Sequence, residues 1–390
     1  MLWYLIPACL IPSMIVCWAA AFAVRRWGPR FGLVDRPGAR KIHAEPMPTA
    51  GGLAIWLGIV LPLLAGQIVL WELVRAQPPS AVRSADAAKL TAEGGGATTF
   101  GIHVPGFAAP HLSGLLHQSG KLWLLLGGGT VLMLLGLADD RRGLDWRLRL
   151  AVQTLVAVVL VCLGWRLSLF LDMPWLTGML SVIWIVGLVN SFNMLDNMDG
   201  LSAGVAAIAA AMFAAVMLST PRPDNNQPQL FIAGFLLVIV GSLLGFLAHN
   251  RPPARLFMGD AGSYLVGYVL AMATLTGTFA GGSLPKHAIL APLCVLAVPL
   301  YDTASVVLIR LRSGRSPFVG DKSHFSHRLV ERGMSKPQAV LTIYLATATC
   351  GLGALLLRQL NVAGAMIVLL MVVCTLALVA VLESADRRRQ

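Results

Sequence analysis

Acid and amide side chains are concentrated in one segment, Asn190–Gly204, which stands between two apolar runs long enough to cross a membrane. Its Asn193, Asp196 and Asp199 recur every third residue, so on a helix or its first turns they share one face. A carboxylate at the centre of a bilayer costs about 2.5 kcal/mol or more. We therefore expect these side chains to meet water, a metal ion or a polar ligand.

Two further acidic clusters flank other apolar runs. Asp139 and Asp140 follow a run, where a solvated helix end is the simple explanation. Acids are poor caps at a helix C-terminus, however, and this favours a functional role. Asp260 lies between glycines at the start of another run. It is placed either to cap that helix or, because the glycines permit close backbone approach, to help bind a phosphate at the helix N-terminus.

Cationic and imidazole side chains gather in the loop 310–338, namely Arg310, Arg312, Arg315, Lys322, His324, His327 and Arg328. The usual positive charge of cytoplasmic loops explains the Arg and Lys residues but not the His residues. Asp321 with the two His residues suits a metal ion, yet the cationic surroundings favour phosphate binding. An earlier loop, Asp35–Gly52, joins basic residues and His43 to a Pro-rich turn and a Gly pair that leaves room for a ligand.

The elements that must position these clusters are apolar helices. The chain is 57% hydrophobic and 12% charged, whereas soluble domains carry about 25% charged residues. Eleven apolar runs are candidate spans, near 3–24, 50–73, 121–138, 149–170, 178–190, 200–219, 229–248, 262–280, 287–309, 339–357 and 362–382. The runs do not alternate as barrel strands do. We therefore predict an all-α, polytopic integral membrane protein with about eleven transmembrane helices in a single domain, 1–390.

Charge asymmetry predicts the orientation of these helices. With the N-terminus outside and the C-terminus cytoplasmic, most of the 30 Lys and Arg residues fall on the cytoplasmic side, as the positive-inside rule requires. The clusters described above then lie on that side too. The net charge of +12 reflects this bias. Nucleic acid is not an expected partner, because no soluble basic domain exists to bind it.

An external insertion at about 75–120, rich in Ala, Gly and Pro, separates the second and third runs. It holds His103, His111 and His117, whose spacing suits a metal site. A poorly ordered or amphipathic insertion is the favoured interpretation. The chain shows no sequence repeat and no second domain.

In five blocks the sequence resembles the polyprenyl-phosphate N-acetylhexosamine-1-phosphate transferases, glycosyltransferase family 4. The blocks are Asp35–Gly52, Gly136–Asp140, Asn190–Gly204, Phe257–Gly267 and Arg312–Leu329, in the family's order. The resemblance implies a bacterial inner-membrane enzyme that moves a sugar-1-phosphate from a UDP-sugar to a polyprenyl phosphate such as undecaprenyl phosphate. Transfer at the cytoplasmic face releases UMP and starts cell-envelope glycan synthesis. The resemblance also implies Mg²⁺, with Mn²⁺ as a substitute, and leaves a homodimer open.

The subgroup looks like the enzymes that use UDP-N-acetylglucosamine. The sister subgroup, which uses UDP-N-acetylmuramoyl-pentapeptide, carries three His followed by Phe-Glu, a run that is absent here; it is the alternative activity. Two positions depart from the family pattern: Ser326 stands for a His of His-x-His-His, and Asn197 for the first Gly of Asp-Gly-x-Asp-Gly. A membrane transporter is the alternative of another class, but transporters place polar sites near the midplane, whereas here they gather at one face.

The resemblance also implies roles for individual residues. Asp260 and Asn193 would bind the metal, while Asp196 and Asp199 hold the nucleotide or support the metal shell. Asp139 and Asp140 complete the catalytic set, as a base or as groups that orient cations. Both roles stay open, because a phosphomonoester has a second pKa of about 6 and hardly needs a base. The remaining expected substrate-binding residues are Lys41, His43, Asn190, Asn197, Arg315, Asp321, His324, His327 and Arg328.

Overall fold

Long helices make up most of the chain in the computed structural model. The structure describes residues 2–35, 46–75, 98–99, 102–103, 112–222, 227–281, 284–318, 320–321 and 323–384. Its longer helices are α1 (Leu2–Trp27), α2 (Gly51–Arg75), α4 (Leu112–Arg142), α5 (Trp146–Cys162), α6 (Pro174–Leu195), α7 (Leu201–Ser219), α8 (Leu230–Asn250), α9 (Gly259–Thr276), α11 (Ala297–Arg312), α13 (Lys336–Leu356) and α14 (Val362–Ser384). The expectation of an all-α membrane protein is confirmed.

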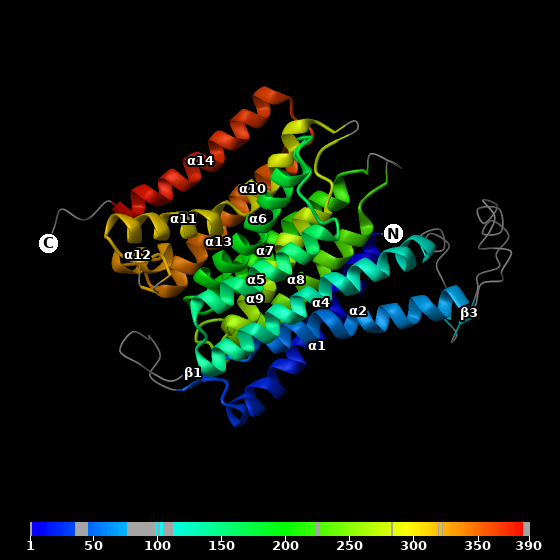
Figure 1. Ribbon diagram of the computed structural model, residues 1–390, viewed down its shortest axis with the longest axis horizontal. Coiled ribbons are helices and arrows are strands. Elements are labelled where there is room, and N and C mark those ends of the chain that lie inside the picture. The colour runs from blue at the N-terminus through cyan, green and yellow to red at the C-terminus, as the bar shows by residue number, and fades with distance from the viewer. Residues whose placement is uncertain are drawn as a thin grey trace.

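Short elements connect the long helices. They are η1 (Gly28–Phe31), η3 (Lys286–Leu290), α10 (Ala291–Val295), α12 (Phe325–Glu331) and the strands β1 (Val34–Asp35), β2 (Met47–Pro48), β3 (Thr98–Thr99) and β4 (Ile102–His103). β1 pairs with β2 and β3 with β4, each antiparallel. Figure 1 places β1, α12 and the C-terminal end of α4 at one end of the bundle, and the N-terminus and β3 at the other.

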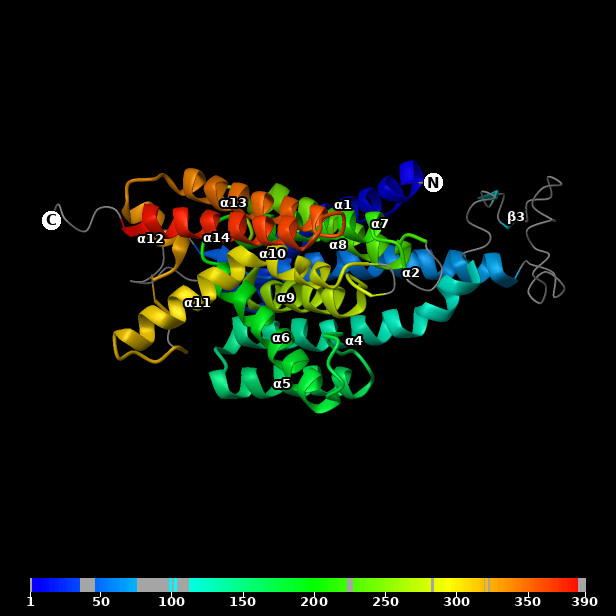
Figure 2. The same ribbon diagram turned by 90° about the horizontal axis from the view of Figure 1, so that it is seen from above.

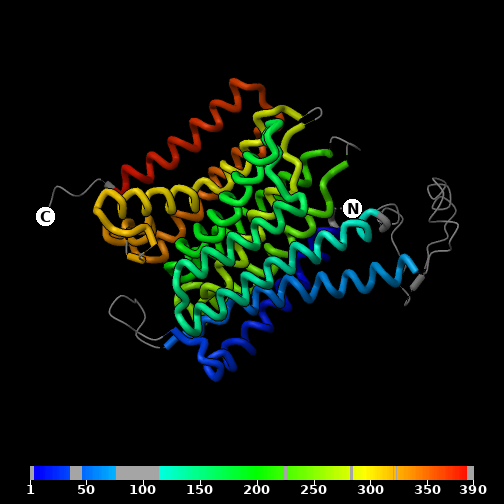
Figure 3. Tube along the Cα trace, in the orientation of Figure 1, coloured from blue at the N-terminus to red at the C-terminus, as the bar shows by residue number. Residues whose placement is uncertain are grey.

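α7 and α8 form the middle of the bundle. Of their most apolar windows 72% and 78% are buried, against 17% in α1 and α14, so the last two present most of their surface outward. The trace in Figure 3 shows α13 and α14 on one side of this centre and α1 and α2 on the other. Figure 2 shows α5 as an outer helix beyond α4. The exposed apolar faces of the outer helices suit a lipid environment.

Glycines let α2, α4 and α9 approach closely at the end of the bundle that carries β1. A Cβ at Gly52 would lie 2.2 Å from the backbone nitrogen of Gly262, and a Cβ at Gly136 would lie 2.3 Å from that of Ala261. Any larger residue would push these helices apart. Asp140 lies one turn beyond Gly136 on α4, so the close approach brings its side chain to the first turn of α9.

The lengths and hydropathy of the helices show how many of them could cross a membrane. Eight helices of the described chain are long and apolar enough to cross a membrane, and the bent pair Lys286–Val295 and Ala297–Arg312 raises the number to nine. α5, with 17 residues, and α9, which begins Gly-Asp-Ala-Gly-Ser, are not among them. Each of the eleven predicted runs nevertheless contains a helix. Eleven spans and the orientation stay predictions.

Two elements differ from the sequence-based expectation. The run 287–309 is broken near Leu296, where the flanking helices meet at 66°. Pro299 explains the break, because it lacks the N–H that would continue the helix from the preceding turn. The short run 178–190 is part of a longer helix, α6, which continues through the amides of the Asn190 block to Leu195.

The predicted insertion at 75–120 is shortened by a helix. α4 already begins at Leu112, so His117 lies on a helix and not in a loop. Of His103 the structure describes the backbone, in β4. His111 lies outside the described residues, and the predicted character of the insertion stays a prediction.

Candidate active site

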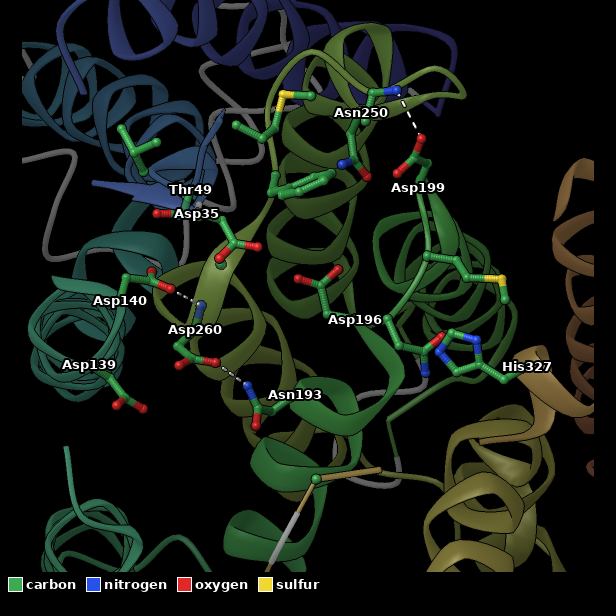
Figure 4. Close-up of a pocket in the computed structure, with 18 of the residues that line it drawn as sticks. Asp35, Thr49, Asp139, Asp140, Asn193, Asp196, Asp199, Asn250, Asp260 and His327 are labelled. Atoms are coloured by element: carbon green, nitrogen blue, oxygen red, sulfur yellow. Dashed lines mark hydrogen bonds between the residues drawn. The ribbon is translucent and has the colours of Figure 1, made fainter. Parts of the chain in front are cut away.

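The polar blocks meet in one pocket of about 1370 Å³ at the β1 and α12 end of the bundle (Figure 4). Each of the five blocks contributes to its wall. The expected site residues that line it are Asp139, Asp140, Asn193, Asp196, Asn197, Asp199, Asp260, Arg315, Asp321 and His327. Packing thus gathers carboxylates from five separate segments, that of Asp35 included, with an Arg and a His residue, around a single space.

Asp140 caps the helix that carries Asp260. Its carboxylate accepts the backbone N–H groups of Asp260 at 3.0 Å and Ala261 at 3.3 Å, which lack partners inside the first turn of α9. Gly259 precedes them with φ +69°, and a Cβ there would lie 2.3 Å from the carbonyl oxygen of Thr49. Because Asp140 supplies the cap, the Asp260 side chain does not cap its own helix and faces the pocket.

The Asp260 carboxylate contacts the end of α6. Asn193 donates from Nδ2 to Asp260 Oδ1 at 2.5 Å and to Ser263 Oγ at 3.0 Å. Figure 4 shows these two side chains pointing toward each other across the pocket wall. The two residues expected to bind a metal are therefore direct neighbours.

Asp139 is buried and surrounded by hydrogen-bond donors. It forms an ion pair with Arg149 at 2.8 Å and accepts the hydroxyl of Tyr264 at 2.9 Å. Its other oxygen accepts the backbone N–H of Leu144 at 2.7 Å. A carboxylate with this many donors is stabilised in its charged form and fixed in orientation.

Asp196 and Asp199 flank the turn between α6 and α7. Asp196 is the residue that ends α6, and burial, followed by the nearby carboxylates of Asp260 and Asp199, raises its pKa to about 8. Asp199 accepts the backbone N–H of Ala254 at 2.9 Å. Asn250 accepts the N–H of Gly200 at 2.9 Å, which ties the same turn to the end of α8.

The donor set of the pocket fits Mg²⁺. Across the described residues no three His, Cys, Asp or Glu side chains converge to form a complete metal site. Mg²⁺, however, commonly takes only one or two carboxylates, with waters and substrate phosphates completing the shell. Asp196 and Asp260 repel each other strongly enough to raise a pKa, and a cation between them would relieve that repulsion.

The α11–α12 loop forms the cationic side of the pocket. Arg315 and Asp321 line the cavity, and Asp321 accepts the buried Arg310 guanidinium at 3.0 Å. Burial opposes ionisation of Asp321, but hydrogen bonds from Ser323 and Arg310 outweigh it and hold the pKa at about 2. The Phe318 ring stacks on Trp146 of α5 with centroids 4.1 Å apart. These contacts fix the loop beside the carboxylates.

Three expected substrate-binding residues are placed elsewhere. In the described part of the chain His324, Arg328 and Asn190 are not among the pocket-lining residues. His324 Nδ1 lies 3.0 Å from Asp302 Oδ2, Arg328 pairs with Glu383 at 2.8 Å, and Asn190 donates to Gln153 at 2.7 Å. Lys41 and His43 lie outside the described residues.

Sequence reasoning missed several residues that hold the site together. Arg149 and Tyr264 bind Asp139, Asn250 fixes the turn at Gly200, and Asp302 binds His324. Arg149 and Asp302 carried a usable signal, since a charged side chain within an apolar run is rare and marks a functional place. Tyr264 and Asn250 carried none, because their importance depends on which helix they face.

The sequence also matches the model of a known protein family. The model of the family described as glycosyl transferase family 4 matches residues 122–278. This stretch covers α5–α9, most of α4, and the aspartates from Asp139 to Asp260.

Three curated proteins are similar over most of their length. The probable undecaprenyl-phosphate N-acetylglucosaminyl 1-phosphate transferase of Bacillus subtilis is 28% identical, over 87% of this chain and 81% of the relative. The decaprenyl-phosphate N-acetylglucosaminephosphotransferase of Mycolicibacterium smegmatis is 31% identical, over 88% and 80%. The undecaprenyl-phosphate alpha-N-acetylglucosaminyl 1-phosphate transferase of Escherichia coli is 27% identical, over 84% and 77%.

Proposed function

Because this chain belongs to glycosyl transferase family 4, we propose that it transfers N-acetylglucosamine 1-phosphate from a UDP-sugar to a polyprenyl phosphate, with release of UMP. The observation that carries the proposal is the pocket in which four carboxylate segments face the loop that carries Arg315 and His327. Two anionic phosphates must approach each other in this reaction, so neutralising their charge is the main catalytic task.

The residues of the pocket divide this task between them. Asp260 and Asn193 are the expected ligands of Mg²⁺, which would offset the negative charge of the pyrophosphate when bound. Asp260 lies close enough to Asp196 to help raise its pKa, and Asp196 would support the metal shell. Asp199 holds the turn between α6 and α7 through Ala254. Arg315 and His327 also line the pocket, where they would contact the anionic part of the UDP-sugar.

Asp139 acts as a positioning group in this proposal. Its oxygens accept hydrogen bonds from Arg149, Tyr264 and Leu144. A carboxylate engaged in this way is a weak proton acceptor. The lipid phosphate, with a second pKa near ~6, is already ionised at neutral pH. Asp139 therefore orients Arg149 and the first turn of α5 beside the pocket.

The proposed membrane topology follows from the distribution of Lys and Arg residues. Eleven spans with the N-terminus outside place the pocket, its basic loop and the C-terminus on the cytoplasmic side of a bacterial inner membrane. The positive-inside rule and the location of β1, α12 and the end of α14 at one end of the bundle support this arrangement (Figure 1). UDP-sugars would then reach the pocket from the cytoplasm and the lipid from the bilayer.

One assay tests the activity. Purified protein in detergent is given Mg²⁺, undecaprenyl phosphate and, in parallel reactions, UDP-N-acetylglucosamine, UDP-N-acetylgalactosamine and UDP-N-acetylmuramoyl-pentapeptide. We expect UMP and a lipid whose mass equals that of polyprenyl pyrophosphate bearing one N-acetylhexosamine. Release of UDP would indicate transfer of the sugar without its phosphate, and product from the pentapeptide substrate alone would assign the sister activity. Either result would refute the proposal.

A further inference from the structure

The helix that carries His327 into the pocket is too short to be stable without contacts to neighbouring elements. α12 has seven residues, Phe325–Glu331, and isolated helices shorter than about 12 residues are marginal in water. Its direction must therefore come from contacts with neighbouring elements. His327 lies on the side of the pocket that carries the α6–α7 turn, which Asp196 begins and Asp199 helps to end (Figure 4).

Two sets of contacts attach α12 to the C-terminal helices. Asp302 of α11 accepts the backbone N–H of Phe325 at 2.7 Å and lies 3.0 Å from Nδ1 of His324, so it satisfies the start of α12. Arg328 pairs with Glu383 near the end of α14 at 2.8 Å. These contacts hold α12 against α11 and α14 but do not reach the aspartates on α6 and α9.

A contact that reaches the aspartate side is made by Ser326. Its hydroxyl donates to Oδ1 of Asn197 at 2.5 Å, across 129 positions of the sequence. Ser326 is 1% exposed, so its hydroxyl is shielded from water. Asn197 Nδ2 donates in turn to the carbonyl oxygen of Met194 at 2.9 Å, which fixes the orientation of the amide. The bond therefore connects the residue before His327 to the residue after Asp196.

Both partners are positions where this chain departs from the family pattern described above. A glycine at 197 would have no side chain to accept the bond. A histidine at 326 would be far larger than the buried serine. A replacement at either position alone would change this contact. With Asn197 and Ser326 both present, the two side chains form one hydrogen bond.

We propose that Asn197 and Ser326 are a positioning pair that sets the location of His327 relative to the Asp196 and Asp199 carboxylates. Neither residue needs to touch the reacting atoms. The inference rests on the proposed transferase activity, in which His327 contacts the UDP-sugar. The pair would then affect turnover through His327.

A double-mutant cycle tests the pair. Asn197→Ala and Ser326→Ala are each expected to lower kcat/KM for UDP-N-acetylglucosamine by about tenfold, because each removes the hydrogen bond that joins the two side chains. The double variant should be no slower than the slower single variant. Losses that multiply to about a hundredfold would show two independent effects and overturn the pairing. Ser313→Ala, which removes an exposed hydroxyl at the end of α11, is the matched control and should keep full activity.

A second cycle separates positioning from a general packing role. Ser326→Ala is combined with His327→Ala, and no further loss beyond that of His327→Ala is expected. A further tenfold loss in that background would show that Ser326 acts on stability or on other residues, and would overturn the proposal. Thermal unfolding of each variant in detergent, expected to remain near that of the wild type, accompanies the kinetics.

Failure of the proposed function and failure of the Asn197–Ser326 inference would give different results. A wild-type protein that forms no lipid product from any UDP-sugar refutes the proposed function and with it this inference. A wild-type protein that transfers the sugar phosphate, but whose variants behave additively, refutes the inference alone.

Discussion

Asp140 and Asp260 are 120 positions apart in the sequence, yet the Asp140 carboxylate accepts the backbone N–H of Asp260 at 3.0 Å. The bond joins the end of α4 to the start of α9 and decides what each acid does. Asp140 is used to satisfy the helix end, which frees the Asp260 side chain to meet Asn193. Two neighbouring carboxylates thus have different roles because of one contact.

Replacing Asp260 by Asn should reduce transfer by at least about a hundredfold while the protein stays folded, because the proposed Mg²⁺ would lose a charged ligand and offset less of the phosphate charge. Initial rates over a range of Mg²⁺ concentrations measure this effect. Asp172→Asn, at an exposed position between α5 and α6, is the control and should keep wild-type rates. Full activity of the Asp260 variant at ordinary Mg²⁺ would remove Asp260 from the metal site.

Gly259 should be intolerant of a side chain. Its φ of +69° makes Ala cost roughly 1–2 kcal/mol through the backbone alone. A Cβ 2.3 Å from the Thr49 oxygen would add strain and displace the Asp140 cap. Gly143→Ala is a matched control, because its φ is +65° but nothing lies within 4 Å of its Cβ. Thermal unfolding and activity should suffer much more in Gly259→Ala; equal losses would show that the close contact is unimportant.

Asp139→Asn should lower activity by a similar factor at every pH between about 5 and 9. The physical reason is that the phosphate nucleophile is ionised without help above about pH 7, while the contacts with Arg149 and Tyr264 are disturbed at any pH. A pH–rate profile of the variant beside the wild type measures this. Recovery of most activity under alkaline conditions would instead identify Asp139 as a base.

The raised pKa of Asp196 should make stability depend on pH in the absence of Mg²⁺. The folded protein holds the proton up to about pH 8, whereas the ordinary value is 3.8. Between these values the folded state binds more protons than the unfolded state, so stability falls as pH rises toward 8. The unfolding temperature in detergent with a chelator should therefore decrease from pH 5 to 8.

Two comparisons check that Asp196 causes this trend. Asp196→Asn has no proton to lose and should make the decrease smaller, while part of it remains because burial also raises the pKa of Asp260, to about 7. Mg²⁺ should raise the unfolding temperature more at pH 8 than at pH 6, since a cation favours the deprotonated carboxylate. A profile that keeps its slope in the Asn variant would assign the effect to another group.

The helices and the acidic clusters were readable from the sequence for simple reasons. Apolar runs of membrane length must form helices, because a bilayer offers no water to the backbone. Carboxylates beside such runs, as at Asp139, Asp196 and Asp260, are costly unless they serve a site. The all-α class and the acidic wall of the pocket could therefore be predicted without tertiary information.

The partners of these side chains were decided only by tertiary packing. An apolar run with little periodicity, such as α6 or α14, does not show which of its faces turns toward which neighbour. The sequence therefore could not show that Arg149 and Tyr264 face Asp139, or that Asp302 and Glu383 take His324 and Arg328 away from the pocket. These contacts join residues from 10 to 125 positions apart, and they depend on helix rotation and on the glycine contacts that bring α2, α4 and α9 together.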